Sequence, residues 1–386
     1  MTRTICIYHG NCADGFTAAW CVREALGDSI EFIPASYGSA PPDVADADVI
    51  IVDFSYKRPV LEHMALDARS ILILDHHKTA QEDLLNLPHP AGGWECHRAV
   101  AGNPVALFDM DRSGAQMAWD YFCIGARPQL VDYVADRDLW TWKLPRSREI
   151  SAVIASHDMT FGQWSDFAAR MQADADLDQM ADEGAAILRK HDRDVRAALD
   201  LTTRTMVIGG HKVPVANTPY HMASDAAGTL AEGNPFAAVY FDGPEGRAFS
   251  LRSRGDGLDV SEIAQSYGGG GHRNAAGFKV PIGWEGDDAG GVAAISAERR
   301  RQIEVEGWTP EHDDAHDQCE LSLAGAVYAL SGSADSEWRN DDRMDAIREL
   351  WPFESHWLKQ TGGREDLVKA GALIAAEIDR LDRTNG

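Results

Sequence analysis

The sequence predicts an α/β protein: a parallel-sheet domain, a helical connector, a smaller α/β domain and a mainly helical C-terminal appendage. Three short runs of β-forming apolar residues near the N-terminus, at 4–8, 49–52 and 71–74, lack polar alternation. Such runs are typical of strands buried on both faces, as in a parallel sheet. The segments between them have helical spacing of apolar residues, which predicts βαβ units with right-handed crossovers.

The expected elements follow in chain order. Helices are expected over 16–26, which ends near Gly27, over 60–68, and over 113–123 with Ser113 as the N-cap. An apolar segment at 130–140 again ends in acids. The Ala-, Asp- and Arg-rich stretch 150–200 has helical periodicity.

From about residue 201 the pattern changes to short strands separated by turns. Strands are expected at 205–208, 212–216, 237–241 and 248–252, then a glycine-rich loop at 268–271, a linker around 281–291, and helices at 293–306, 321–330 and 366–382. These patterns divide the chain into residues 1–145, 146–200, 201–282 and 293–386.

Composition narrows the function. The formal net charge is −25 over 386 residues, whereas proteins that track long nucleic acids normally carry a basic stripe, so small substrates are favoured and long-duplex binding is not expected. No apolar stretch approaches the roughly 18–20 residues of a membrane span. The N-terminus lacks a signal-peptide pattern and the six cysteines lack CxxC spacing, which predicts a cytoplasmic protein. The sequence leaves open whether the protein forms a homodimer.

Acids and histidines stand where the three predicted strands end. His9 follows the first strand, Asp53 the second, and Asp75, His76 and His77 the third. The carboxyl ends of parallel strands meet at one edge of a sheet, so these side chains should converge there, with Asp14 close behind His9. Because gathered carboxylates repel one another, a bound cation is the usual remedy, and the sequence predicts a metal site.

These motifs together resemble the DHH phosphoesterase superfamily. The resemblance rests on the segment from His9 to Gly15, on Asp53, on the Asp75-His76-His77 triplet and on Asp136, in the family's order. The later GGGGHRNAAGF segment at 268–278, with Ser250-Leu-Arg252-Ser253, is similar to the DHH-associated C-terminal domain. The likeness covers roughly residues 1–282.

The resemblance implies hydrolysis of phosphoesters by two divalent ions, usually Mn²⁺, with Mg²⁺ as the alternative. It implies that His9 holds the first ion, that Asp53 bridges both, and that Asp14, His76 and Asp136 hold the second, with Asp136 preferred to Asp138. Asp75 and His77 would orient ligands or touch the phosphate beside the catalytic Asp53. Imidazole and carboxylate ligands suit such ions.

One position departs from the family pattern. Many members carry an aspartate two residues before the position of Asp14, where this chain has Cys12. Cysteine is a softer ligand, so the sequence leaves open whether Cys12 binds the first ion or is a bystander.

The glycine-rich loop predicts phosphate binding. Consecutive glycines allow positive φ, so the backbone N–H groups of Gly269, Gly270 and Gly271 are expected to face one anion, with charge added by His272 and Arg252. In the family, this domain holds the substrate end away from the scissile bond. A cleft between the domains would then select short substrates.

The expected function is metal-dependent hydrolysis of short oligonucleotides or of linear or cyclic dinucleotides. The alternatives are a RecJ-like single-strand exonuclease, a pyrophosphatase, and a nucleotide-binding sensor with an impaired metal site. The appendage is rich in Glu, Asp and His between residues 298 and 320. Two interpretations of this segment are open: a solvated acidic helix, or a second metal-binding module loosely similar to MazG-type pyrophosphohydrolases. The appendage also resembles appendages of phage-encoded proteins.

Overall fold

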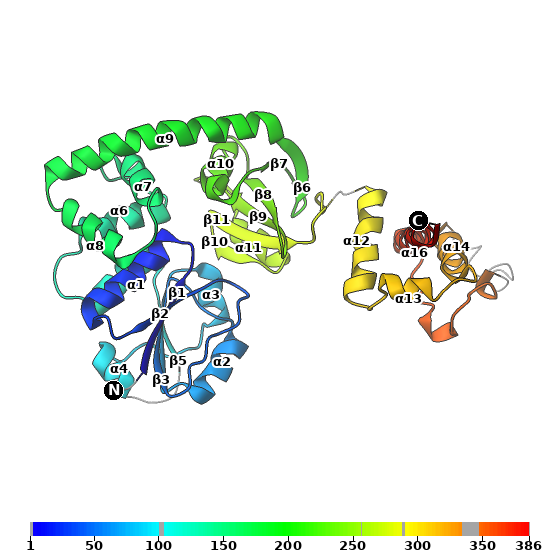
Figure 1. Cartoon of the computed structure of the whole chain (residues 1–386), viewed down its shortest axis with the longest axis horizontal. Helices are drawn as coiled ribbons and strands as arrows, with labels where there is room; N and C mark the ends of the chain where they lie inside the picture. The colour runs from blue at the N-terminus through cyan, green and yellow to red at the C-terminus, as the bar shows by residue number, and fades with distance from the viewer. Residues whose placement is uncertain (1–2, 100–103, 256, 288–289, 334–346, 386) are drawn as a thin grey trace. The chain divides into compact units, whose positions relative to one another are not determined.

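The computed structural model describes residues 3–99, 104–255, 257–287, 290–333 and 347–385 (Figure 1). It confirms the predicted α/β class. The chain divides into two compact units. The first contains Met1–Arg204, Pro214–Phe241 and Phe249–Phe278, and the second contains Thr205–Val213, Asp242–Ala248 and Lys279–Gly386.

The first unit is built on a parallel sheet. Its strands are β1 (Arg3–His9), β2 (Glu31–Ala35), β3 (Ala47–Val52), β4 (Ser70–Asp75) and β5 (Pro104–Phe108), in the order β2-β1-β3-β4-β5. Tyr8 of β1 is in register with Val52 of β3, which is in register with Leu74 of β4. The residues that follow these three therefore lie at one edge of the sheet. The strand order reverses between β1 and β3, which is where doubly wound sheets bind their ligands.

Alternation of side chains along the strands buries both faces of this sheet. On β3, Ile50 and Val52 belong to one apolar core and Val49 and Ile51 to another. The first core includes residues of α1 (Ala13–Leu26) and α5 (Gly114–Phe122), and the second includes Leu61 and Met64 of α2 (Arg58–Asp67). A strand covered on both faces needs apolar residues at every position, which explains the uninterrupted runs.

The remaining helices of the N-terminal part are α3 (Lys78–Asp83), α4 (Trp94–Ala99), α6 (Gln129–Asp138), α7 (Ser147–Ala155), α8 (Phe161–Arg170) and α9 (Asp174–Thr202). Ser113 caps α5 as predicted, because its side chain accepts a hydrogen bond from the Gln116 N–H while the Gln116 side chain accepts one from the Ser113 N–H. The long helix α9 leads from this part of the unit to the second sheet (Figure 1).

Two strands of the first sheet were not among the expected elements. β2 contains Pro34, which in the sequence suggests a turn more than a strand. In the structure β2 is an edge strand, where the missing N–H donor of proline is tolerated. β5, at the other edge, likewise begins with Pro104. Most of the apolar segment at 130–140, for which no element type was predicted, belongs to helix α6.

The second sheet confirms the strands expected after residue 201. It contains β6 (Arg204–Ile208), β7 (His211–Asn217), β8 (Ala237–Gly243), β9 (Gly246–Arg252), β10 (Gly270–His272) and β11 (Ala275–Val280), in the order β10-β11-β9-β8-β7-β6. Three short helices accompany it: η1 (Tyr220–Met222), α10 (Ala223–Leu230) and α11 (Val260–Ser266). Part of the expected glycine-rich loop is thus strand β10.

The C-terminal part is helical, as expected. It contains α12 (Gly291–Glu304), α13 (Pro310–Asp314), α14 (Glu320–Ser333), η3 (Ser355–Trp357) and α16 (Gly363–Asn385). Leu321 and Tyr328 of α14 share an apolar core with Ala370 and Leu373 of α16. Asp288 and Ala289 of the expected linker lie outside the described residues. Among the described helices, none combines the length and the apolarity needed to cross a membrane.

Candidate metal centre

Asp53 occupies a strained backbone position where β3 ends. Its φ is +55°, a left-handed conformation that aspartate tolerates better than most residues. Its N–H donates to the Leu74 carbonyl at 2.9 Å, which ties it to β4. The side chain is almost fully buried, at 1% exposure. Strain of this kind, held in place by neighbouring strands, is frequent at functional sites.

Two histidines contact the Asp53 carboxylate. His76 Nε2 lies 2.9 Å from Asp53 Oδ1, and His9 Nδ1 lies 3.5 Å from Asp53 Oδ2. Burial alone would raise the pKa of Asp53, but His76 and His9 outweigh it and hold that pKa well below its usual range. Asp53 is therefore a buried anion between two imidazoles.

His76 faces three carboxylates at once. Its Nε2 is 3.5 Å from Asp138 Oδ2 and 3.8 Å from Asp14 Oδ2, in addition to its contact with Asp53. Burial would lower the pKa of His76, but these acids outweigh it and raise the pKa to about 10. Without a metal ion, a proton on His76 compensates the gathered negative charge.

Asp14 is held by the N-terminus of α5. Both of its carboxylate oxygens accept from the Ala115 N–H, at 3.2 and 3.3 Å. Burial, then the charges of Asp53 and Asp138, raise the pKa of Asp14 well above its usual range. A Cβ at position 114 would lie 2.5 Å from the Asp53 Cβ and 2.9 Å from Asp14 Oδ2, so Gly114 is required for α5 to come this close.

Asp75 fixes the two histidines that follow it. Its Oδ1 accepts from the His76 N–H at 2.8 Å and the His77 N–H at 3.3 Å, and it lies 2.7 Å from His77 Nδ1. Because a carboxylate accepts, His77 carries its proton on Nδ1 and keeps Nε2 free as a lone-pair donor.

The structure does not bring Asp136 into this cluster. Its carboxylate accepts from the Lys143 and Leu144 N–H groups at 2.8 and 3.1 Å and from the Thr141 hydroxyl. Asp138, the residue that the sequence analysis ranked second, instead faces His76. Both lie in the last turn of α6, and the two-residue offset turns their side chains about 200° apart on a helix.

Two further residues lie near the centre. Burial raises the pKa of the Cys12 thiol well above its usual value, and the neighbouring acids Asp53, Asp138 and Asp14 add to this. The Tyr37 ring lies 5.6 Å from the His9 ring and 5.8 Å from the His77 ring. Sequence reasoning missed Tyr37 because it missed β2; a strand ending at Ala35 would have placed it at the same sheet edge.

The glycine-rich segment packs directly on the helix that follows the Asp-His-His triplet. The Gly271 N–H donates to Thr79 Oγ1 of α3 at 3.2 Å, and Lys78 Nζ lies 2.7 Å from Asp259 Oδ2. The His272 ring stacks on the His77 ring with centroids 4.4 Å apart. Burial, then the charges of His77 and His76, lower the pKa of His272 well below its usual value, which keeps this ring neutral.

The glycines expected to form an anion nest have other roles. The Gly269 N–H donates to the Ala264 carbonyl at 2.9 Å, and Gly270 and Gly271 pair with β11. A Cβ at Gly269 would lie 2.1 Å from the Gly277 carbonyl oxygen, and one at Gly270 would lie 2.7 Å from Thr79 Oγ1. These glycines allow close backbone packing, and the Gly269 and Gly271 N–H groups already have partners within the protein.

Arg252 is a cation whose hydrogen bonds go to neutral oxygens. Its guanidinium donates to Ser224 Oγ at 2.7 Å, to Ser250 Oγ at 3.2 Å and to the Leu251 carbonyl at 2.8 Å. Burial, then the charge of Arg137, lowers the pKa of Arg252 to about 10. A cation held this way is suited to receive an anionic group.

The donor set fits divalent metal ions. Asp53 Oδ2, Asp138 Oδ2 and His9 Nδ1 are buried and have no hydrogen-bond partner among the described residues. Ligand atoms cluster within 4.8 Å of one another in three sets: His9 with Asp53 and His77; Asp14 with Asp53 and His76; and His76 with His77 and His272. Asp53 belongs to two of the three. Mixed imidazole and carboxylate donors suit Mn²⁺ or Mg²⁺.

Comparison with known proteins finds one family model that matches part of the chain. Residues 214–308 match the family model of the DHHA1 domain. A protein of Acanthamoeba polyphaga mimivirus, uncharacterized protein R106, is 28% identical over 302 residues, which covers 71% of this chain and 66% of that protein. The match therefore spans less than two thirds of the viral protein.

The solved structures that match this chain have low sequence identity and TM-scores below 0.5. The DHH domain of a protein assigned to a ribosomal protein family is 13% identical, with a TM-score of 0.45, and the match covers 72% of this chain and 82% of that one. The pGpG-specific phosphodiesterase PggH of Vibrio cholerae is 13% identical, with a TM-score of 0.38 and coverage of 72% and 94%. RecJ of Thermus thermophilus, in complex with Mn²⁺, is 14% identical, with a TM-score of 0.37 and coverage of 72% and 49%.

Proposed function

Since this chain carries a DHHA1 domain and resembles the DHH phosphoesterases, we propose that it is a metal-dependent phosphodiesterase for short oligonucleotides or linear or cyclic dinucleotides. One observation carries the proposal: the Asp53 carboxylate is shared by two neighbouring sets of metal-ligating groups, one with His9 and one with His76. A carboxylate in that position is suited to bridge two ions, and two-ion centres hydrolyse phosphate esters.

The proposed ligands follow from these sets and, for Asp138, from its contact with His76. His9 and Asp53 would hold the first ion, and Asp14, Asp53, His76 and Asp138 the second, with Asp138 in the place that the family resemblance assigned to Asp136. When bound, Mn²⁺ or Mg²⁺ would neutralise charge on the phosphate and lower the pKa of the attacking water. Cys12 is not assigned to either ion, because none of the three sets of ligand atoms among the described residues contains its thiol.

The protein's own groups would position the phosphate. Asp75 holds His77 with Nε2 free, and the neutral His272 stacks on His77. The His272 ring and the Arg252 guanidinium would bind the non-bridging phosphate oxygens and orient the ester for attack. His77 Nε2 carries a lone pair, so it would not donate to these oxygens. The oxygen of water bonds to phosphorus as the water gives up a proton, the ester P–O bond breaks, and the leaving oxygen takes up a proton.

Two features support a short substrate. The segment around His272 packs against α3 through Thr79 and Lys78, so the groups proposed to bind phosphate stand directly beside the proposed metal ligands. The formal net charge of −25 opposes the long-range attraction that a processive nuclease uses to hold nucleic acid.

A substrate panel tests the proposal. The full-length protein, with Mn²⁺ and separately with Mg²⁺, would be incubated with a linear dinucleotide, a cyclic dinucleotide, a longer single-stranded oligonucleotide and pyrophosphate. We expect hydrolysis of a dinucleotide that requires the metal and exceeds the rate on the longer oligomer. Faster processive cleavage of the oligomer would instead identify an exonuclease, and release of phosphate from pyrophosphate alone would identify a pyrophosphatase.

A further inference from the structure

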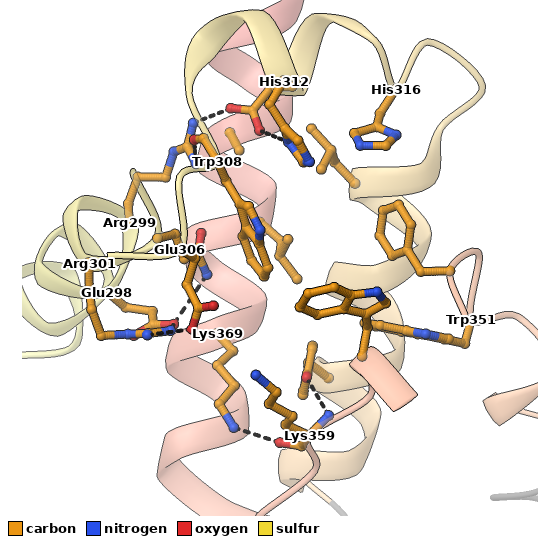
Figure 2. Close-up of a pocket in the computed structure, with 18 residues that line it drawn as sticks. Glu298, Arg299, Arg301, Glu306, Trp308, His312, His316, Trp351, Lys359 and Lys369 are labelled. Carbon is orange, nitrogen blue, oxygen red and sulfur yellow. Dashed lines mark hydrogen bonds and ion pairs between the residues drawn. The ribbon is translucent and has the colours of Figure 1, made fainter. Parts of the chain in front are cut away.

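The helical end of the chain contains a cavity of about 230 Å³ within the second unit (Figure 2). It is lined by residues of α12, α13, α14 and α16 and by the segment that carries Trp351 and Lys359. The sequence left open a second metal-binding module in this part of the chain. Among the described residues, however, the clusters of metal-ligating groups all lie in the first unit.

Aromatic rings form much of the cavity wall. Trp308 and Trp351 both line it, and each is fixed by other rings. The Trp351 ring lies 5.5 Å from the Tyr328 ring and 5.5 Å from the Phe353 ring, and the Trp308 ring stacks parallel to the His312 ring at 6.2 Å. Indoles held in this way offer flat π faces to a planar ligand with little loss of side-chain freedom.

One cation at the cavity, Lys359, forms no direct ion pair among the described residues, although the hydrogen bond from Arg301 and then the charge of Lys359 lower the pKa of the nearby Glu306. The other charged groups pair within the unit: Arg301 with Glu298 and Glu306, Arg299 with Asp313, and Lys369 with Asp366. Lys359 Nζ has no carboxylate within ion-pair distance in the part of the chain that the structure describes, and it lies 5.5 Å from the Trp357 ring centroid. In Figure 2 the two lysines lie at one end of the cavity and His312 and His316 at the other. The lysine end is suited to an anion.

A buried acceptor also lines the cavity. The Gln302 side chain is only 2% exposed, and its Nε2 donates to Glu298 Oε1 at 3.2 Å. Its Oε1 has no hydrogen-bond partner among the described residues. A buried carbonyl oxygen without a donor is unfavourable, so a ligand that brings an N–H group here would satisfy it.

We propose that this cavity binds a nucleoside monophosphate. The base would stack on the indoles of Trp308 and Trp351 and donate an N–H to Gln302 Oε1, and the phosphate would meet the Lys359 ammonium. The cavity is smaller than the roughly 300–1,000 Å³ of sites for drug-sized ligands, which suits a single base better than a dinucleotide.

The charges favour an anionic ligand over an organic cation. Aromatic cages bind quaternary ammonium groups through their π faces. Here the carboxylates of Glu298 and Glu306 are occupied by Arg301, and Glu306 also feels the charge of Lys359, so no carboxylate is left to hold a second cation, which Lys359 would repel. The proposal does not depend on the phosphodiesterase activity, because the cavity belongs to the second unit alone and needs no metal ion.

Calorimetric titration of the full-length protein tests the site. AMP, GMP, CMP and UMP would each be added in buffer with a chelator, and choline would serve as the cationic probe. We expect one site per chain for at least one nucleotide, and no binding of choline. Trp351→Ala should weaken binding about tenfold to a hundredfold, since loss of a base–aromatic stack has effects of this size. Lys359→Ala should reduce the affinity for the nucleotide to that for its free nucleoside.

Controls separate this site from the metal centre. Lys279→Ala removes an exposed lysine of the same unit that pairs with Glu245 and lies outside the cavity lining, so it should leave binding unchanged. Arg252→Ala should also leave it unchanged. If none of the four nucleotides binds at millimolar concentration, if choline binds instead, or if Arg252→Ala abolishes binding while Trp351→Ala does not, the proposal is wrong.

Discussion

The imidazole of His272 stacks on the imidazole of His77 with ring centroids 4.4 Å apart and planes inclined by 24°. One ring follows the glycines of β10 and the other completes the Asp-His-His triplet after β4. The contact joins the two sequence motifs that define the proposed enzyme, within a single compact unit. The groups proposed to bind phosphate and those proposed to bind metal therefore form one site.

Asp138 and Asp136 should respond differently to the same substitution. We expect Asp138→Asn to weaken Mn²⁺ binding at least tenfold with little effect on stability, because its Oδ2 faces His76 and has no other partner among the described residues. Asp136→Asn should instead lower the free energy of unfolding, by about 1–3 kcal/mol, since its carboxylate accepts from the Lys143 and Leu144 N–H groups. Calorimetric Mn²⁺ titration and denaturant unfolding of both variants would distinguish a metal ligand from a residue that stabilises the fold. The reverse pattern would restore Asp136 as the ligand.

Metal binding should depend on pH through His76. In the metal-free protein the pKa of His76 is raised to about 10, so at neutral pH a proton occupies the nitrogen that a metal ion would need. Mn²⁺ must displace this proton, so its apparent affinity should rise with pH, by up to tenfold per pH unit, and level off near pH 10. Titrations in buffers with different ionisation enthalpies would measure the proton release. Binding without proton release would show that His76 is not a ligand.

Arg252 should contribute to substrate binding and not to metal binding. Its guanidinium is held by Ser224 and Ser250, and those hydrogen bonds leave its positive charge available to an anionic partner. Arg252→Ala should raise KM about tenfold to a hundredfold, as expected for the loss of one charge-assisted hydrogen bond, and leave Mn²⁺ affinity unchanged. Steady-state kinetics combined with metal titration would separate the two effects. Loss of Mn²⁺ binding with an unaltered KM would remove Arg252 from the phosphate site.

Much of the centre could be predicted because it depends on strand ends. Uninterrupted apolar runs locate β1, β3 and β4, and parallel register then brings His9, Asp53 and Asp75 to one edge. The positive φ of Asp53 was not predicted; in the structure it accompanies a hydrogen bond from the Asp53 N–H to β4, a contact between segments far apart in the sequence.

Other features depended on tertiary packing that local sequence does not encode. Which of Asp136 and Asp138 faces His76 depends on the direction in which the last turn of α6 presents each carboxylate. The glycines at 269–271 are required by the close approach of β11 and α3, whereas the sequence pattern suggested an open anion nest. Tyr37 was missed because Pro34 obscured β2.

The most direct test of the account is Asp53→Asn compared with Asp46→Asn. Both residues have left-handed φ values, +55° each, which asparagine tolerates, so the backbone effects are matched. Asp46 is exposed and lies before β3, whereas Asp53 is shared by two sets of metal ligands. The measurement is the number of Mn²⁺ ions bound per chain together with the rate of dinucleotide hydrolysis. The account predicts that Asp53→Asn stays folded but loses at least one ion and more than about 99% of the rate, as expected when the bridging ligand of a two-ion centre is lost, while Asp46→Asn matches the wild type. A folded Asp53→Asn protein with turnover within tenfold of wild type would contradict it.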